Sequence, residues 1–278
     1  MARRPQLVPW RTAGRVSEEQ RSNDDVVREI GWVFNNETGD CLDLEEFTRT
    51  GDHEIEAYLR AFELWNDHQL DQTLVEIGSG IGRMTSGFSR LFGSVVACDL
   101  DGAFLERCRQ TVAQLGVVER LRTCHVADGR TLGMKDAEAD LTFSYITLQH
   151  CQHDDGLSLV SEAVRVTRPG GHIALNFRTW TAVDIVLWPL GKMTRSLWRV
   201  PKFGPWVARR RLLSRFGWQA NRLSPDEVCR HIDALGEPLT NRQIFQSPLR
   251  KVTTRAGIQI RTFEGVHRSH WWLIAERV

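Results

Sequence analysis

The sequence has 278 residues, of which 26% are charged and 41% hydrophobic, and its 36 Lys and Arg residues nearly balance 35 Asp and Glu residues. Abundant apolar residues with a net charge near zero exclude a largely disordered chain, and the charge balance excludes a general attraction to nucleic acids. Six cysteines without a CxxC pair exclude a disulfide framework and a cysteine zinc site. They favour reduced thiols in the cytoplasm.

We expect no targeting signal in the first part of the chain. Its first 15 residues lack the apolar stretch of a signal peptide, and no apolar run reaches the about 20 residues that cross a membrane. We interpret residues 1–22 as a poorly ordered arm, and residues 1–53 together as an N-terminal arm and cap segment. We therefore expect a cytoplasmic protein.

Strands and helices alternate along the next part of the chain. Apolar residues at spacings of three and four predict a helix over residues 54–69. The five strands are expected at residues 73–77, 94–98, 121–126, 140–146 and 172–177. This alternation predicts a parallel sheet with helices on both faces. Because such sheets bind ligands beyond the carboxyl ends of their strands, the residues that follow each strand are the most informative.

The alternation stops after the fifth strand. Residues 181–221 contain eight Lys or Arg and one acid, Asp184, and five of the ten tryptophans fall between residues 180 and 218. Further on, Ser224 begins a helix that Gly236 ends, and the remaining residues alternate like strands, the last at 271–276. We divide the chain after residue 53 into a nucleoside-binding core (54–180), a basic tryptophan-rich insertion (181–221), and a helix with strands that complete the sheet (222–278).

A glycine-rich turn follows the first strand. Gly78, Gly80 and Gly82 form GxGxG and not the GxGxxG of dinucleotide sites, in which Arg83 would be glycine. Glu76, at the end of the strand, would repel a diphosphate and attract a cation.

Acids also follow the next two strands. Asp99 ends the second strand, and its two oxygens can accept hydrogen bonds from both hydroxyls of a ribose. Asp128 follows the third strand and can accept a hydrogen bond from the amino group of an adenine. With Glu76, these acids describe a cationic nucleoside without phosphate, and S-adenosylmethionine has this chemistry.

The segments EIGSGIGRMT at 76–85 and VVACDLD at 95–101 resemble the first two motifs of the class I S-adenosylmethionine-dependent methyltransferases. Asp128-Gly129 resembles the adenine-contacting acid of that family, and RPGG at 168–171 its turn before the fifth strand. The resemblance covers roughly residues 71–177, with 224–236 and a final strand. It implies a Rossmann-like α/β fold with a seven-stranded, mostly parallel sheet, an antiparallel last strand and an inserted lid lobe.

The resemblance also assigns roles to the acids. It implies that Glu76 and the glycines face the methionine end of the methyl donor, Asp99 the ribose and Asp128 the adenine. Asp101 is expected to cap the helix that follows it. The expected donor-binding residues are Glu76, Gly78, Ser79, Gly80, Gly82, Arg83, Asp99, Leu100, Asp128, Gly129 and Tyr145.

Two histidines follow the fourth strand, where the acceptor is expected. This segment lacks the Asn/Asp-Pro-Pro-Tyr/Phe pattern of base and amide N-methyltransferases. His150 resembles a position often occupied by histidine in small-molecule methyltransferases, and we expect His150 or His153 to accept the proton of a hydroxyl group. His267 and His270, before the last strand, are weaker candidates. A turn-capping role for His150 stays an equal alternative.

A metal site is a further alternative. His150, His153, Asp154 and Asp155 have suitable donor atoms for a divalent metal ion, although paired acids at a helix start are more often caps. We assign no metal ligands.

The insertion is expected to cover the acceptor. Its tryptophans suit a saccharide, because aromatic faces stack on sugar rings. A basic, tryptophan-rich surface also suits peripheral membrane contact or a single-stranded nucleic acid. Tryptophans that pack inward, with solvated arginines, are the structural alternative.

The sequence thus predicts methyl transfer from S-adenosylmethionine to a hydroxyl group of a small molecule, with a saccharide or glycosylated metabolite in first place. A membrane-presented lipid or quinone, a nucleic acid, and a nucleoside-binding module without activity are the alternatives. A homodimer stays open.

Overall fold

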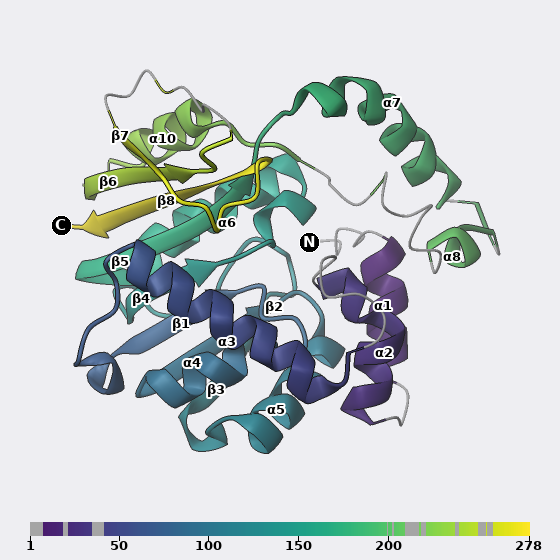
Figure 1. The fold of residues 1–278 in the computed structure, drawn as a ribbon, viewed down its shortest axis with the longest axis horizontal. Helices are drawn as coiled ribbons and strands as arrows, with labels where there is room; N and C mark the ends of the chain where they lie inside the picture. Colours follow the sequence, from purple (N-terminus) through teal and green to yellow (C-terminus); the bar gives the residue numbers. More distant parts are fainter. Residues whose placement is uncertain are drawn as a thin grey trace.

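A mostly parallel sheet forms the centre of the computed structural model, which describes residues 8–18, 22–34, 42–198, 200–201, 203–208, 217, 221–236, 239–249, 254 and 258–278. In this part of the chain the sheet has eight strands in the order β3-β2-β1-β4-β5-β8-β6-β7 (Figure 1). The strands are β1 (Thr73–Ile77), β2 (Ser94–Asp99), β3 (Leu121–His125), β4 (Ala139–Ser144), β5 (Thr167–Arg178), β6 (Leu239–Gln246), β7 (Gln259–Thr262) and β8 (His270–Arg277).

The strand directions confirm the predicted Rossmann-like α/β fold. Strands β1 to β5 pair in parallel, and β8 pairs antiparallel with both β5 and β6. The expectation was seven strands; the additional one is β7, a four-residue edge strand parallel to β6. Its residues are largely exposed, so the sequence lacks the apolar pattern that predicts a strand.

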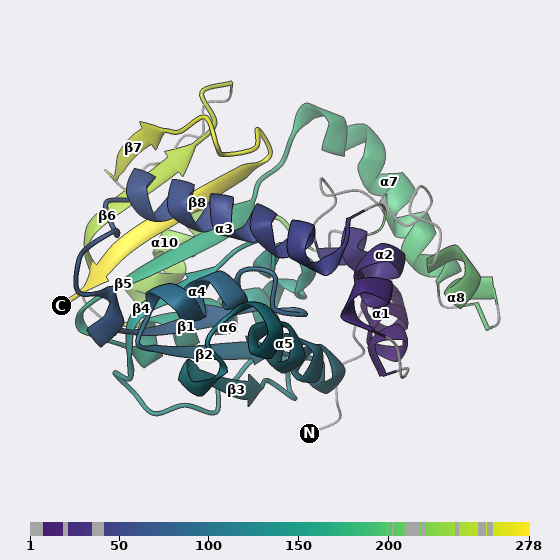
Figure 2. The ribbon, with the colours of Figure 1, turned by 60° about the horizontal axis from the view of Figure 1, so that its bottom comes forward.

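Helices cover both faces of the sheet (Figures 1 and 2). Val96 and Cys98 of β2 face one apolar cluster, which includes residues of α6 and α10, whereas Val95 faces another, which includes residues of α3 and α4. This alternation along one strand is the expected consequence of a pleated backbone. The helices of the core are α3 (Leu44–Ala61), α4 (Thr85–Leu91), α5 (Gly102–Leu115), α6 (His153–Val166) and α10 (Pro225–Ala234), with the short 3-10 helices η1 (Gln69–Asp71), η2 (Val118–Arg120) and η3 (Leu148–His150).

Three element boundaries differ from the predictions. Helix α3 begins ten residues earlier, because Asp43 and Glu46 form a capping box in which each side chain accepts the other's backbone N–H. It also ends at Ala61, eight residues before the predicted end at residue 69. Strand β5 begins at Thr167, so the predicted turn at 168–171 lies within the strand, where its pairing with β4 is irregular. Ser224 caps α10 as predicted, since its side chain accepts the Glu227 N–H.

Four further helices form a cap at the carboxyl ends of the strands. They are α1 (Val8–Glu18), α2 (Asn23–Phe34), α7 (Ala182–Leu197) and α8 (Phe203–Ala208), called here the cap helices. Helix α7 leaves the sheet and runs outward to α8, which lies beside α1 (Figure 1). Val16, Val27, Trp198 and Val207 share one apolar cluster, so the cap joins distant parts of the chain.

The interpretation of residues 1–22 as a poorly ordered arm is wrong for residues 8–18, which form α1. So short a helix is unstable alone and depends on tertiary packing, which a local pattern does not reveal. Ala13 and Val16 are buried, and Arg107 of α5 donates to the carbonyl of Ser17 at 2.8 Å.

Much of the predicted insertion is described, but not all of it. Six of its basic residues and one tryptophan are among those that lie outside the described part: Arg199, Lys202, Arg209, Arg210, Arg211, Arg215 and Trp218. Among the described residues, no helix has both the length and the apolar character needed to span a membrane.

Candidate functional site

A cavity of about 180 Å³ lies at the carboxyl ends of β1, β2 and β4, under α1 and α2. Most of the predicted site residues line it, and Gly82 and His153 do not. The predicted residues that do are Glu76, Gly78, Ser79, Gly80, Arg83, Asp99, Leu100, Asp128, Gly129, Tyr145 and His150.

The absence of side chains in the glycine turn lets neighbouring side chains pack directly against its backbone. Gly78 and Gly80 have φ angles of +85° and +55°, in the left-handed region that favours glycine. A Cβ on Gly78 would lie 2.1 Å from the hydroxyl oxygen of Thr147, and one on Gly80 would lie 2.8 Å from the ring of Phe34. Both glycines are therefore required for the shape of this wall.

Gly82 serves the packing of a helix. A Cβ at this position would lie 3.1 Å from the backbone of Cys108 on α5. This glycine allows α5 to approach the turn, which explains why it does not line the cavity.

Asp99 is held by the turn that it faces. Its two carboxylate oxygens accept the N–H groups of Gly80 at 2.9 Å and Asp101 at 3.0 Å. Each oxygen keeps a further lone pair for a ligand hydroxyl. Burial raises the pKa of Asp99 to about 6, against the effect of these hydrogen bonds. Asp101 caps α5 as predicted, because its side chain accepts the Ala103 N–H.

Glu76 is a buried carboxylate at the end of β1. Only 5% of its surface is exposed, and its Oε2 accepts a hydrogen bond from the Thr85 hydroxyl at 2.6 Å. Burial raises its pKa to about 7, although Thr85 and the nearby charge of Arg83 oppose the shift. A cation in the cavity would favour the charged form of this group.

Arg83 is fixed by helix α3. Its guanidinium lies 2.5 Å from a carboxylate oxygen of Glu54 and donates to the hydroxyl of Thr50 at 3.2 Å. The Tyr145 hydroxyl donates to Glu54 at 3.3 Å, so one α3 carboxylate holds two cavity residues.

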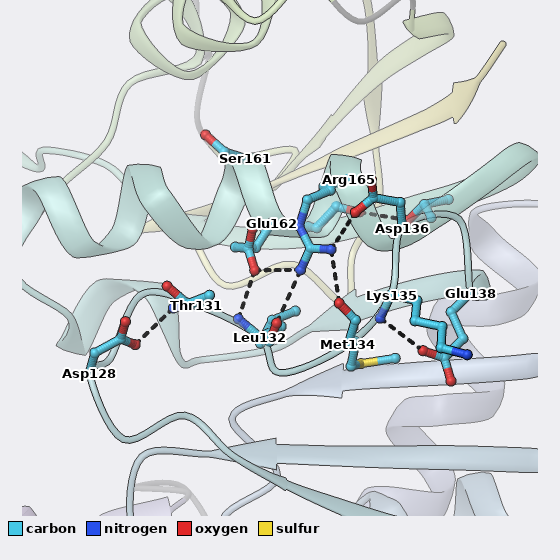
Figure 3. Close-up of polar contacts among 12 residues, drawn as sticks. Asp128, Thr131, Leu132, Met134, Lys135, Asp136, Glu138, Ser161, Glu162 and Arg165 are labelled. Atoms are coloured by element: carbon cyan, nitrogen blue, oxygen red, sulfur yellow. Dashed lines mark hydrogen bonds and ion pairs between the residues drawn. The ribbon is translucent and has the colours of Figure 1, made fainter.

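The loop that carries Asp128 is fastened to α6 (Figure 3). The Asp128 carboxylate accepts the N–H groups of Arg130 and Thr131 at 2.8 and 2.9 Å. Further along, Glu162 accepts the Leu132 N–H at 2.7 Å, and Arg165 donates to the Leu132 carbonyl at 3.0 Å. The loop is therefore shaped before any ligand binds.

His150 ends η3 and faces the cavity beside Trp10. The centroids of the two rings lie 4.5 Å apart. The amide nitrogen of Gln149 donates to His150 Nε2 at 3.2 Å, and the amide oxygen accepts from His270 Nε2 at 2.7 Å. Because an amide nitrogen only donates, His150 Nε2 is the acceptor in this pair.

His270 reaches the site only through Gln149. Burial, together with the charge of Arg178 and the proximity of His267, lowers the pKa of His270 to about 3, so its imidazole is neutral. His267 bonds to Ser269 at 2.8 Å. Neither residue lines the cavity.

His153 lies away from the cavity. It is exposed, and it pairs with Asp154 at 3.2 Å and with Glu227 at 2.8 Å, which raises its pKa. Asp155 pairs instead with Arg130, so the four residues considered for a metal do not converge. Within the described ranges, no group of three or more His, Cys, Asp or Glu residues has the arrangement of a metal site.

The sequence prediction missed several cavity residues. Trp10 and Phe34 come from the cap helices, which had no recognised role in the site. Ile146 and Thr147 follow β4, and Ile146 adopts a φ of +54°, which is strained for a β-branched residue. Asp155 was considered only as a possible metal ligand or helix cap, although its position after β4 was a usable signal for a cavity residue.

The sheet order, the glycine turn and the acids after three strands define a nucleoside-binding domain with the architecture of a methyltransferase. Residues 75–175 match the family model of a methyltransferase domain. This part of the chain is a class I S-adenosylmethionine-dependent methyltransferase domain, as the sequence predicted.

Individual relatives differ in what they act on. The chain is 25% identical over 219 residues to the ubiquinone/menaquinone biosynthesis C-methyltransferase UbiE of Vibrio cholerae, with 73% of this chain and 77% of that protein covered. It is 26% identical over 143 residues to the tRNA 5-carboxymethoxyuridine methyltransferase of Escherichia coli, with 48% and 53% covered.

A solved structure shares the fold. The magnesium protoporphyrin IX methyltransferase of Synechocystis PCC 6803, crystallised with bound SAH, superposes with a TM-score of 0.53 at 15% identity, over 92% of this chain and 98% of that chain.

Proposed function

We propose that this methyltransferase transfers the methyl group of S-adenosylmethionine to a hydroxyl group of a small molecule, and that His150 accepts the hydroxyl proton. The observation that carries the proposal is that His150 lines the same cavity as Glu76, the glycine turn and Asp99. In this position His150 can reach the hydroxyl group of an acceptor that is bound next to the methyl donor.

The acids of the cavity suit the methyl donor. Bound S-adenosylmethionine supplies a methyl group on a sulfonium, which is displaced in line by a nucleophile. Glu76 offers a carboxylate to the cationic end, Asp99 offers acceptors to the ribose, and Asp128 to the adenine. The contribution of these residues is to orient the donor.

Other titratable groups that line the cavity are less suited to act as the base. Asp155 is paired with Arg130, and burial raises the pKa of Tyr145 well above its usual range. With Glu76 and Asp99 assigned to the donor, His150 is the group best suited to accept a proton near neutral pH.

Gln149 defines the resting state of the base. Its amide N–H occupies Nε2 of His150, which therefore carries the lone pair and not the proton. The acceptor hydroxyl would replace this amide as the donor to Nε2. Neutral His270, bonded to the other end of the amide, keeps Gln149 in the required orientation.

Fewer tryptophans are available to stack on a saccharide than the sequence suggested. Trp198 is buried in the cap, and Trp180 and Trp188 lie 5.1 Å apart with the Arg222 guanidinium over both rings. Trp206 is 49% exposed and stacks on Phe203. A saccharide remains a prediction that depends on the exposed faces of Trp180 and Trp206.

A membrane-presented lipid or quinone is the second candidate. The similarity to a protein named for quinone methylation supports it, as do large apolar side chains exposed on α7 and α8. The relative that acts on tRNA matches about half of this chain, so its support for a nucleic acid is weaker.

The test is methyl transfer to a panel of acceptors: free saccharides, glycosylated aromatics and hydroxylated quinones. With an active acceptor, His150→Ala should lower the single-turnover rate by about 10²-fold or more, because the hydroxyl loses its base. Affinity for S-adenosylhomocysteine should change little, and the rate of the wild-type enzyme should fall as pH decreases below neutral.

His153→Ala is the matched control, since this exposed histidine lies outside the cavity. It should retain the wild-type rate and pH profile. Near-full activity of His150→Ala with an unchanged pH profile would remove the proposed base.

A further inference from the structure

The outer face of the cap exposes a row of large apolar side chains. Leu190, Met193 and Leu197 lie on one side of α7, because their spacings of three and four match the helical repeat. The row continues through Val200 and Phe203 to Trp206, and these six side chains are between 37% and 56% exposed. We call these six residues the apolar row.

A neighbouring side of α7 faces the protein. Asp184, Gly191, Thr194 and Trp198 are buried and recur at helical spacing along that side. The helix is thus anchored by one face, and the apolar row is not needed for its packing. Several large apolar side chains exposed along one anchored helix and the segment after it indicate a surface that binds a partner.

The stretch of sequence that contains the apolar row is strongly basic. The sequence has no Asp or Glu between residues 185 and 221, where it has eight Lys and Arg. Asp184, just before this stretch, is buried and paired with Arg178 and Arg222. Lys192 is exposed on α7, next to the row in sequence. A partner of this surface must therefore be apolar and anionic at once.

We propose that the outer face of α7 and α8 binds the surface of an anionic lipid bilayer. Leucine, methionine and valine side chains suit acyl chains, whereas single-stranded nucleic acids need aromatic platforms along a groove. A second copy of the chain would bring two basic faces together, and their repulsion opposes such a dimer. With no spanning helix among the described residues, the contact is interfacial.

The position of this face relates it to the site. The cap helices lie together on one side of the molecule, away from β6 and β7 (Figure 2). Helix α8 packs on α1, and α1 carries Trp10, which lines the cavity. A bilayer bound here lies beside the helices that cover the donor site. The inference concerns this surface and does not depend on the role of His150.

Co-sedimentation of the full chain with vesicles tests the inference. The chain should bind vesicles of phosphatidylcholine mixed with phosphatidylglycerol, and bind pure phosphatidylcholine vesicles much more weakly. Raising the salt concentration from about 0.1 M to about 1 M should release much of the bound protein, because the screening length falls from about 10 Å to about 3 Å.

Variants separate the apolar row from the rest of the surface. The triple variant Met193→Gln, Leu197→Gln, Phe203→Gln should lower vesicle binding by at least about tenfold, since three apolar insertions are lost. The matched control is Leu70→Gln, which removes an apolar side chain that is 58% exposed, next to the amino end of β1. Circular dichroism and donor affinity would verify that each variant is folded.

Three results would overturn the inference. They are absence of binding to anionic vesicles, equal binding of the triple variant and the wild type, and a wild-type dimer that the triple variant converts to monomers without any vesicle binding. The last result would assign the face to a second copy of the chain. Methyl transfer by a variant that no longer binds vesicles would leave the proposed function intact.

Discussion

Glu76 is a carboxylate whose charge depends on what occupies the cavity. Burial raises its pKa to about 7, so the empty protein holds a proton there in much of the population at neutral pH. A cationic ligand favours the charged form and lowers this pKa on binding. Donor binding and proton release are therefore linked.

We expect affinity for S-adenosylmethionine to rise between about pH 6 and pH 8. S-adenosylhomocysteine, which lacks the sulfonium charge, should show a smaller change. Glu76→Gln should weaken binding of S-adenosylmethionine and remove most of the pH dependence. Calorimetry in buffers of different ionisation enthalpy measures both the affinity and the protons released; equal affinities at the two pH values would contradict the linkage.

The same shift has an opposite effect on stability. Since the folded-state pKa of Glu76 lies above the ordinary value of 4.5, its contribution to the stability of the empty protein falls as pH rises from 4.5 to about 7. Glu76→Gln should thus raise the Tm of the empty protein at pH 8. The ionised carboxylate of Glu76 therefore destabilises the empty protein, and the same negative charge favours binding of the cationic donor.

Asp99 and Asp101 give a comparison of two neighbouring acids. Asp99→Ala should weaken donor binding by about 1–3 kcal/mol, because the ribose hydroxyls lose a charged acceptor. Asp101→Ala removes the α5 cap instead and should cost about 1 kcal/mol of stability with little change in affinity. Calorimetry and urea unfolding measure the two effects, and unchanged affinity in Asp99→Ala would place the ribose elsewhere.

The residues at the strand ends could be predicted because parallel strands bring their carboxyl ends to one edge. Glu76 and Asp99 end buried runs of apolar residues, Asp128 follows the more exposed strand β3, and each of the three lines the cavity. Trp10 and Phe34 could not be predicted, because nothing local shows that a short helix folds over that edge. His153 followed the same strand as His150, but the start of α6 turns it outward to Glu227.

At the scale of elements, a capping box and two ion pairs hold the start of α7 in place. Thr181 and Asp184 form a capping box, and the Asp184 carboxylate also pairs with Arg178 and Arg222. Although burial opposes it, the bonds from Arg222 and Thr181 hold the pKa of Asp184 below its usual range. This cluster sets the direction in which the helix leaves β5.

Asp184→Ala should destabilise the protein by about 3–5 kcal/mol, because two arginines lose a buried partner. Hydrogen exchange of α7 should speed up more than that of β1 to β5, and turnover should fall more than donor affinity. Thr181→Ala is the control, with a loss of about 1 kcal/mol from the cap alone. Uniform loosening of the whole chain would contradict a local role.

Strands and cap helices differed in how well they could be predicted. Strands β1, β2 and β4 are short, mostly buried runs with many apolar residues, and four of the five predicted strands, β3 included, were placed within two residues. The helices α1, α2 and α8 are short, and their apolar residues pack against residues that are distant in the sequence. Boundaries set by capping, such as that at Asp43, depend on one hydrogen-bonding pair.

At the scale of the whole molecule, we expect the cap to respond to ligand binding as one unit. Residues of α1, α2 and α8, with Trp198 after α7, share an apolar cluster, and Trp10 and Phe34 from this body touch the cavity. Adding S-adenosylhomocysteine should slow hydrogen exchange in α1, α2 and α8 together, with little effect on β6 and β7. Protection of α1 and α2 without α8 would show that the cap is divided.

Strand β8 lies between β5 and β6 in the sheet, yet both are made before it. During synthesis on the ribosome, the edge of β5 stays uncovered until residues 270–277 emerge. The pair β6–β7 meanwhile lacks the strand that attaches it to the sheet. Open apolar edges invite pairing between nascent chains. This order of strands makes the interval before β8 arrives the period in which a slowed ribosome or a missing chaperone does the most damage.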